Sequence, residues 1–444
     1  MGKVEMHTWY RQYQKLKAQY PDTILLYRLG EFYETFDDDA KLVAELMDTT
    51  LTRKEHAVEK STKEKQYCPM AGIPFHAAEN YVARLVSQGY RVAIAEQMSE
   101  TSSSKSDTRP RSVFASGLEQ TSKQRGLVHR EVVRVITPGT VLDPSMLPTS
   151  KNNYLAAVIA EGDRIGLSYT DLSTGEFAAT ELSGERAITR LEGELARLHV
   201  SEVLVHEHTS QQVPGLAPVR ASLSQDLAPM TKQEREHLLP HERVARRLEQ
   251  ENTARWTQGN VTPLAAWQWE HATACDTLMQ QLGVQSLAGF GLDQKPLATR
   301  AAGAVLHYIQ ETQRNSAAQI TTLRVYTTGS FMFLDPQTRR NLELLESSEG
   351  KSKGSLIGVL DHTRTPMGAR LLRRWLSQPL LDHAALARRQ EAVACAVDDG
   401  LMRAELRQAL GQVGDMERSV NRVIQGTAVA TPRDLVYLRQ ALRA

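Results

Sequence analysis

The sequence contains little cysteine and no long apolar run. Its three cysteines, Cys68, Cys275 and Cys395, are far apart in a chain of 444 residues. That spacing excludes a local metal knuckle, and an odd number argues against a disulfide framework, so we expect free thiols in a reducing compartment. The start lacks the apolar stretch of a signal peptide, and no run of about eighteen apolar residues, the length of a membrane helix, occurs. These absences predict a cytoplasmic protein.

Charge of either sign is not in excess. The 53 Lys and Arg residues and the 52 Asp and Glu residues leave a formal net charge of +1. The strongly basic composition of many nucleic-acid-binding proteins is therefore absent, and any contact with phosphates has to come from local groups of Lys and Arg. The hydrophobic fraction of 41% and the charged fraction of 24% are typical of a soluble globular protein. The length predicts two to four domains of roughly 100–200 residues each.

A loop for binding nucleotide phosphates is also missing. The pattern G-x-x-x-x-G-K-[S/T], whose backbone amides cradle the phosphates of ATP, occurs nowhere in the sequence. We therefore expect no ATP site and identify no catalytic site in this chain. The helical pattern of residues 432–444 continues to the final residue without a capping signal. This suggests that the sequence is part of a longer protein.

The first part of the chain mixes helix and strand patterns. Helical spacing of apolar residues and short runs of β-branched and aromatic residues predict helices and strands in turn. The helices are expected over residues 8–18, 39–47 and 77–88, and the strands over 23–29, 32–36 and 91–95. Residues 99–126 are polar and basic without a period, which predicts a flexible surface segment, either a solvated linker or a loop close to phosphates. We place this mixed α/β domain at residues 1–128.

A second, smaller α/β domain is predicted over residues 129–262. Strand patterns joined by Gly, Pro, Asp and Ser turns dominate its first half, and a helix and a further strand follow. The strands are expected over residues 132–136, 154–160, 164–171, 176–181 and 203–206, and the helix over 188–198. Strands followed by a βαβ-like unit indicate a mixed sheet.

The remainder, residues 263–444, has the pattern of a helical domain. Helices are expected over residues 265–282, 296–313, 365–376, 382–396, 402–412 and 432–444. In the helix at 365–376, a buried apolar stripe is expected opposite a basic face; the stripe is Leu371, Leu372, Trp375 and Leu376, and the face is Arg370, Arg373 and Arg374. We interpret these arginines as a solvated face rather than as a DNA-binding one. The fold class is therefore multidomain α/β plus α.

The run Gly30-Glu31-Phe32-Tyr33-Glu34-Thr35-Phe36 is the most informative motif. In an extended strand, Phe32 and Glu34 share one face and Tyr33 points to the other. One interpretation is structural, with Phe32 packed in a core and Glu34 capping the next helix. The other is functional. An aromatic wedge can enter the minor groove and unstack a base step, which costs less free energy where pairing is defective, and a neighbouring carboxylate is tolerated only if it hydrogen-bonds a displaced base.

Several long motifs resemble the bacterial MutS family. The runs LLYRLGEFYETF and PMAGIPFHAAENYVARLVSQGYRVAIAEQ resemble its mismatch-binding domain, and Phe32-Tyr33-Glu34 falls on the family's Phe-x-Glu motif. Similarity continues through VVRVITPGT and YTDLSTGEF, which resembles the connector domain, to LDPQTRRNLEL and LDHTRTPMGARLLRRWLSQPL in the helical core. The motifs follow the family's order over nearly the whole chain, and together they are far more specific than Phe-x-Glu alone.

The resemblance implies a function in DNA mismatch repair. Phe32 would stack on a mispaired base in bent duplex DNA, and Glu34 would hydrogen-bond that base. Arg28, Met70 and His76 lie in matching segments and would contact the DNA backbone or shape the loop, although core packing explains each equally well. The expected ligand is double-stranded DNA with mismatches or small loops.

The resemblance also implies partners and missing parts. Members of the family act as homodimers, recruit MutL and use ATP and Mg²⁺ in an ATPase domain that this chain lacks, together with the clamp and the returning half of the helical core. The connector domain would have a ribonuclease-H-like fold, and the protein would be cytoplasmic and associated with the nucleoid. Residues 99–126 and the Lys/Glu-rich residues 55–67 are longer than the family's corresponding stretches and are expected to be surface-loop insertions.

Two alternative functions stay open. Asp171 and Glu176 flank a strand turn in the predicted connector domain, and nucleases of the ribonuclease-H fold gather carboxylates around Mg²⁺. A metal-dependent nuclease is therefore one alternative, although it needs a denser acidic cluster. A paralogue that binds branched DNA without reading mismatches is the other.

Overall fold

The structure is a computed structural model of the whole chain. The residues that it describes are 4–59, 64–98, 129–206, 260–313, 317–426 and 430–443, together with 209, 213 and 216. The predicted surface segment at 99–126 lies outside the described residues. The chain divides into two compact units: Met1–Thr140 with Glu311–Asn315 and Gly426–Val429, and the remainder. Each unit is described by itself.

The first unit is built on a seven-stranded sheet with the order β1-β4-β5-β3-β2-β6-β7. Neighbouring strands are antiparallel except for β2 and β6, which are parallel. The strands are β1 (Val4–Met6), β2 (Ile24–Leu29), β3 (Phe32–Phe36), β4 (Thr52–Glu59), β5 (Lys65–Pro74), β6 (Val92–Gln97) and β7 (Arg130–Ile136). Gly30 has a φ of 62° in the turn between β2 and β3, a conformation that glycine adopts without strain.

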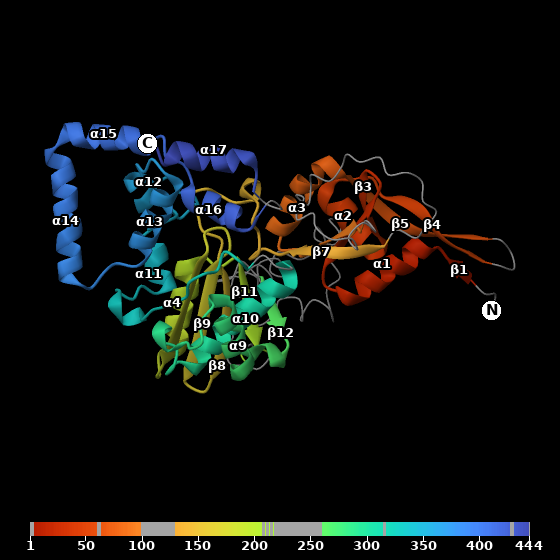
Figure 1. Cartoon of the computed structure of the whole chain (residues 1–444), viewed down its shortest axis with the longest axis horizontal. Helices are drawn as coiled ribbons and strands as arrows, with labels where there is room; N and C mark the ends of the chain where they lie inside the picture. The colour runs from red at the N-terminus through yellow and green to blue at the C-terminus, as the bar shows by residue number, and fades with distance from the viewer. Residues whose placement is uncertain are drawn as a thin grey trace, which may run out of the picture. The chain divides into compact units, whose positions relative to one another are not determined.

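Three helices cover the two faces of this sheet. Helix α1 (Thr8–Gln19) lies on one side, and α2 (Asp37–Met47) and α3 (Ala78–Ser87) lie on the other (Figure 1). Tyr10, Tyr13 and Leu16 of α1 pack on Tyr27 and Phe36 of the sheet. This packing gives the α1 side of the sheet an aromatic core, at one end of β3.

The predicted helices and the three strands of the first 98 residues are confirmed within one or two residues. The Lys/Glu-rich run at residues 55–67 was wrongly expected to be an inserted loop, because its described residues belong mainly to β4 and β5. Alternating Lys and Glu suit strands that are exposed on one face, and composition alone does not distinguish them from a loop. The strand predicted at 132–136 is present as β7, but it pairs with β6 of the first sheet rather than opening a second one.

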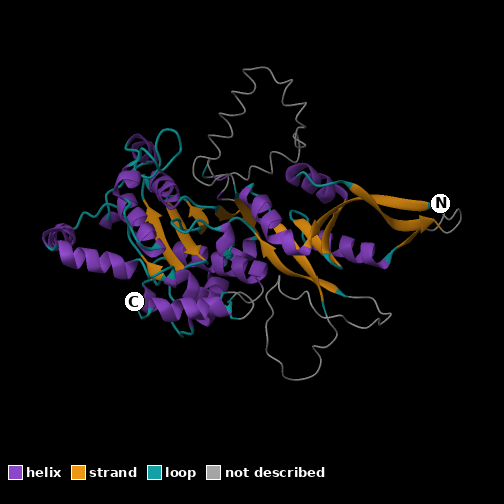
Figure 2. Ribbon diagram, turned by 90° about the horizontal axis from the view of Figure 1, so that it is seen from above, coloured by secondary structure: helices purple, strands orange, loops and turns teal. Residues whose placement is uncertain are grey.

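The second unit contains a six-stranded mixed sheet with the order β12-β11-β8-β9-β10-β13. Figure 2 draws the strands of the chain in orange and its helices in purple. Its strands are β8 (Leu155–Glu161), β9 (Arg164–Asp171), β10 (Glu176–Ser183), β11 (Glu202–His206), β12 (Val261–Leu264) and β13 (Arg324–Val325). Successive residues of β8 alternate between two cores, as strand geometry requires. Leu155, Ala157 and Ile159 face α9 (His271–Leu282) and α10 (Pro296–Gln313), whereas Ala156 and Val158 face α4 (Ala187–Leu198).

The packing of α9 and α10 differs from the expectation. The helical pattern correctly predicts α10 at Pro296–Gln313, but both helices were grouped with the helical domain. In the structure they cover one face of the second sheet, with Ala298, Ala301, Ala302 and Val305 in its core. A helical period shows that one face is apolar, but it does not show which element covers that face.

The rest of the second unit is helical. It comprises α11 (Pro336–Asn341), α12 (Leu356–Leu360), α13 (Pro366–Ser377), α14 (His383–Asp398), α15 (Gly400–Leu410), α16 (Met416–Ile424) and α17 (Pro432–Ala441). Six of these helices, α11 to α16, begin with a side chain that accepts a backbone N–H that would otherwise lack a partner. The capping residues are Asp335, Ser355, Thr365, Asp382, Asp399 and Asp415. Helices α14 and α15 have no buried residue among those described.

The orientation of α13 is the reverse of the expected one. Arg370 is buried, whereas Leu371 and Trp375, which were expected in the buried stripe, are 43% and 41% exposed. The prediction of a solvated arginine face was wrong because acidic partners distant in sequence, at Asp415 and Glu176, bind Arg370 and Arg374. Helical periodicity identifies the two faces of α13, but it does not reveal such partners.

Candidate functional site

The β2–β3 hairpin presents an aromatic side chain to solvent. Phe32 is 47% exposed at the start of β3, whereas Tyr33 is completely buried. Glu34 follows on the same face as Phe32 and is only partly buried, and Phe36, further along this face, is packed beneath α1. The face of β3 therefore passes from a buried aromatic core at Phe36 to an exposed aromatic ring at Phe32.

Phe32 lies beside a residue without a side chain. Glu34 on β3 is paired with Gly72 on β5, and a Cβ atom built on Gly72 would lie 3.8 Å from Cδ1 of Phe32. The ring of Phe32 therefore lies close to the Gly72 backbone. A Cβ at that distance would make an ordinary van der Waals contact with the ring.

Glu34 forms an ion pair across the sheet. Its Oε2 atom accepts a hydrogen bond from Nζ of Lys54, which lies on β4, two strands away. The two side chains are 13% and 31% exposed, respectively. Nζ of Lys54 also lies 5.2 Å from the centre of the Trp9 ring and 5.8 Å from that of Phe36, both within range of a cation–π interaction. Lys54 is thus held between the aromatic core and the carboxylate.

The opposite face of the hairpin is a buried polar support. Nε of Arg28 donates to the Gly30 carbonyl at 2.6 Å, and its guanidinium lies 3.8 Å above the Phe75 ring. The Tyr33 hydroxyl donates to Glu96. Burial raises the pKa of both Tyr33 and Glu96, and their hydrogen bond raises that of Tyr33 further. These contacts attach the turn that carries Phe32 to the sheet.

The other residues named in the sequence analysis lie in different environments. Arg28 is 8% exposed and shapes the turn from inside the protein. Met70 is partly buried and packs against the core beneath α1. His76 is exposed in the short helix Phe75–Ala77, directly after Pro74, which pairs with Phe32. Phe32 and His76 are therefore the two exposed members of the set.

Lys54 was missed because its position depends on a register that the sequence does not show. It is 20 residues from Glu34, and β5 separates their strands. The available signal was the β4–β5 hairpin: Lys54 pairs with Cys68 and Glu34 pairs with Gly72, four residues further along β5, so the side chains of Lys54 and Glu34 lie on the same face of the sheet. Since residues 55–67 were interpreted as a loop, that signal was not used.

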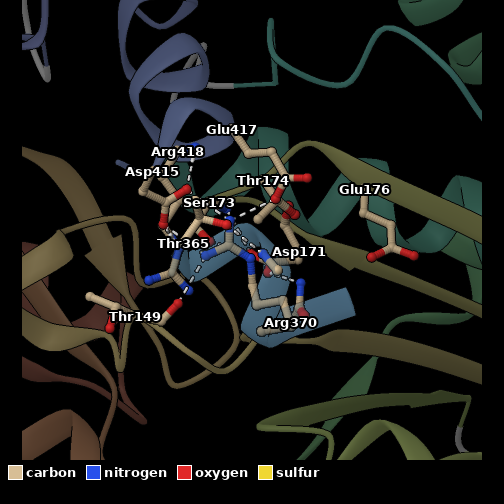
Figure 3. Close-up of polar contacts among 12 residues, drawn as sticks. Thr149, Asp171, Ser173, Thr174, Glu176, Thr365, Arg370, Asp415, Glu417 and Arg418 are labelled. Atoms are coloured by element: carbon tan, nitrogen blue, oxygen red, sulfur yellow. Dashed lines mark hydrogen bonds and ion pairs between the residues drawn. The ribbon is translucent and has the colours of Figure 1, made fainter. Parts of the chain in front are cut away.

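The second unit contains a denser group of charges around the turn between β9 and β10 (Figure 3). Asp171 is fully buried and accepts hydrogen bonds from Asn152 at 2.8 Å and from the hydroxyl of Ser173 at 2.6 Å, and also from two backbone amides. Arg418 of α16 donates through Nε to the Ser173 hydroxyl at 3.1 Å. The turn is thereby joined to the helical part of the same unit.

Arg370 of α13 completes this group, which we call the arginine cluster: Asp171, Ser173, Arg370, Asp415, Glu417 and Arg418. Its guanidinium donates to both carboxylate oxygens of Asp415, at 2.7 and 2.8 Å, and to Glu417 at 2.6 Å. Burial alone would lower the pKa of Arg370, but the hydrogen bonds that it donates to Asp415 and Glu417 outweigh burial and raise the pKa. Each carboxylate in the cluster therefore has a permanent partner.

These contacts argue against the nuclease alternative. Glu176 is bound by Arg374 at 2.6 Å and by the Tyr154 hydroxyl at 3.0 Å, and the oxygens of Asp171 are occupied by hydrogen bonds from Asn152 and Ser173. Among the described residues, no group of three or more His, Cys, Asp or Glu is placed to hold a metal ion. The two acids are structural in this arrangement.

Within the described part of the chain, no helix has the length and apolarity needed to cross a membrane.

The fold and the site define a class of protein: a multidomain chain with two sheets covered by helices and a helical region, with an exposed aromatic side chain at its candidate site. Three family models cover most of the chain. MutS domain I matches residues 7–145, MutS domain II matches residues 153–321, and MutS domain III matches residues 337–444. The chain belongs to the MutS family.

Relatives over the whole chain carry the same name. The DNA mismatch repair protein MutS of Roseiflexus castenholzii is 61% identical over 443 residues, which are 99% of this chain and 41% of that protein. Those of Chloroflexus aurantiacus and Symbiobacterium thermophilum are 59% and 40% identical, over 100% and 98% of this chain and 46% and 43% of their own length. The chain thus spans less than half the length of these relatives.

Proposed function

We propose that this chain supplies the mismatch-reading part of a DNA mismatch repair protein, and that Phe32 is the residue that enters the duplex. The observation that carries the proposal is the exposure of Phe32, 47%, on a hairpin whose other aromatic residues, Tyr27, Tyr33 and Phe36, are completely buried. An exposed phenyl ring on a supported turn has a free face with which to stack on a base. The relatives are DNA mismatch repair proteins by name, which supports the choice of DNA as the ligand.

Discrimination would come from the deformability of the DNA. Inserting an apolar side chain at a base step costs a few kcal/mol in lost stacking. The cost is smaller where the bases are already mispaired, so the same wedge binds a defective site more tightly than a matched one. Glu34 would then accept a hydrogen bond from the displaced base, because it lies on the same face as Phe32. Exposed His76 is placed near the same turn and would contact the sugar-phosphate backbone.

Other parts of the function would lie outside this chain. The sequence contains no phosphate-cradling loop, so binding of ATP and Mg²⁺ would require the further length that the relatives have. Homodimer formation and recruitment of MutL are likewise proposals for the complete protein. The ligand proposed for this chain is duplex DNA with a mismatch or a small loop.

The test compares Phe32→Ala with a matched control. The affinities of this chain for a heteroduplex with one mispair and for the matched homoduplex are measured at fixed salt. Tyr67→Ala serves as the control because Tyr67 is also an exposed aromatic residue of the first sheet, at 54%. Phe32→Ala should reduce the ratio of the two affinities to about one, whereas Tyr67→Ala should leave it unchanged. An unchanged ratio in Phe32→Ala would refute the wedge.

A further inference from the structure

The Glu34 carboxylate has one occupied oxygen and one open oxygen. Oε2 is bound by Nζ of Lys54, and Oε1 accepts no hydrogen bond from any of the described residues. The open oxygen belongs to the same side chain as the bound one, and it lies on the face of β3 that carries Phe32. Lys54 therefore restrains the carboxylate while leaving an acceptor available beside the exposed ring.

Lys54 is itself restrained from the other side. The Trp9 and Phe36 rings lie 5.2 and 5.8 Å from Nζ, and the Lys54 side chain is only 31% exposed. A lysine on the open surface can reach many phosphates, because its stem is flexible. Contacts with two rings and one carboxylate reduce that freedom. Its charge is directed at Glu34 rather than at solvent.

The electrostatic consequence concerns every duplex, matched or mispaired. An ionised carboxylate close to DNA is repelled by the phosphates, and the repulsion is strongest where water is excluded. A lysine in contact with that carboxylate cancels most of the repulsion at a distance and still leaves Oε1 able to accept a hydrogen bond. The ion pair would thus remove the general penalty of placing an acid at a DNA-binding face, without removing its selectivity.

We propose that Lys54 is the positioning residue of the reading site: it neutralises Glu34 and orients its open oxygen towards the base that Phe32 displaces. This inference rests on the proposed function, because the carboxylate has to face a base. In this proposal Lys54 affects DNA binding by holding Glu34, and it does not contact a phosphate itself.

A double-mutant cycle separates these two actions. The variants are Lys54→Met, Glu34→Gln and their combination, and the affinities for heteroduplex and homoduplex are measured at fixed salt. Lys54→Met should weaken binding to both duplexes by about fivefold when Glu34 is present, the effect of one partly buried ion pair. In the Glu34→Gln background the same change should have less than about a twofold effect, since no charge is left uncompensated. Lys54→Arg should restore binding.

The control is Lys65→Met. Lys65 forms an ion pair with Glu55 on the same β4–β5 hairpin, at 2.8 Å, and lies on the open surface. Lys65→Met removes one positive charge from the same hairpin without a contact to Glu34. Its effect on DNA affinity should therefore be the same with Glu34 and with Glu34→Gln. Unfolding of each variant, followed by circular dichroism, shows that the fold is retained.

The outcomes distinguish the inference from the function on which it rests. If Lys54→Met weakens binding by the same factor with and without Glu34, Lys54 acts directly on phosphate and the inference is overturned, while a mismatch preference of the unaltered chain keeps the proposed function. If the unaltered chain shows no mismatch preference, the proposed function fails and the inference fails with it. Non-additive effects combined with a mismatch preference support both.

Discussion

The face of β3 that carries Phe32 and Glu34, which we call the reading face after its proposed role, and the arginine cluster of the second unit both contain acids paired with basic residues. They differ in how completely those acids are bound. Glu34 has one partner and an open oxygen. In the cluster, Asp415 is bound through both oxygens by Arg370, and fully buried Asp171 accepts four hydrogen bonds. A carboxylate whose oxygens all accept hydrogen bonds within the protein can join elements of the fold. A carboxylate with one free oxygen can still accept a hydrogen bond from a ligand.

The two regions also differ in what surrounds the charges. Arg370 and Arg418 are each 4% exposed in their side chains. Loss of Arg370 removes the guanidinium that donates to Asp415 and Glu417, and loss of Arg418 removes the donor to Ser173 and to two backbone carbonyls. Phe32 is exposed, and its removal leaves no cavity. The comparison predicts that substitutions in the cluster change stability, whereas substitutions at Phe32 and Glu34 change binding.

The largest effect on stability is expected for Arg370→Met. The variant leaves Asp415 and Glu417 without their shared partner, and loss of one member of a buried ion pair costs about 3–5 kcal/mol. Urea unfolding followed by circular dichroism measures the change, with Arg364→Met on the exposed surface as the control. A loss as small as that of the control would mean that the cluster does not hold the second unit together.

Acidification should weaken the same cluster. Burial alone would raise the pKa of Asp415, but hydrogen bonds from Arg370 outweigh it and hold the pKa below the usual value of 3.8. Because the folded pKa is lower than the unfolded one, the stabilisation is present above the unfolded pKa and is lost as the pH falls through the folded pKa. The free energy of unfolding should therefore fall more steeply below about pH 4 in the unaltered chain than in Arg370→Met. Equal slopes would contradict this assignment.

A smaller effect is expected for Tyr33→Phe beneath the reading face. The change removes the hydroxyl that donates to the partly buried Glu96, and a lost hydrogen bond of this kind costs about 1–3 kcal/mol. Burial already raises the pKa of Glu96, and the Tyr33 hydrogen bond opposes that rise, so the pKa should increase further in the variant. Unfolding measurements and the titration of Glu96 by NMR check the two expectations. Stability equal to that of the unaltered chain would show that the support is dispensable.

The smallest effect is expected for Lys65→Met. Its ion pair with Glu55 is exposed, and exposed pairs contribute little because water and salt screen them. The unfolding midpoint should stay within the error of the measurement. A clear decrease would show that the β4–β5 hairpin depends on surface charge, and it would remove the contrast with the buried cluster.

Much of the fold was predictable from local patterns. Alternation in FYETF correctly places Phe32 and Glu34 on one face of β3 and Tyr33 on the other, and apolar spacing correctly gives α1, α3 and α10. These features depend on the period of one element and on nothing else in the chain. The period does not show which face is buried, and Phe32 and Glu34 were singled out by the resemblance to the Phe-x-Glu motif.

The features that were not predicted depend on partners far away in the sequence. Arg370 can be buried because Asp415, 45 residues later in the sequence, accepts its hydrogen bonds. Glu34 has an ion-pair partner because Lys54 lies on β4, most of which was expected to be a loop. A helical or strand period contains no information about such partners. The register of the sheet and the packing of α16 on the β9–β10 turn supply them.

The central claim, that the ring of Phe32 reaches and unstacks a base, can be tested directly with a fluorescent base. A heteroduplex carries 2-aminopurine next to the mispair, where stacking quenches its emission. Binding of the unaltered chain should change the emission, and saturating amounts of Phe32→Ala should not, because the alanine methyl group is too short to enter the stack. The same change of emission with Phe32→Ala would contradict the account.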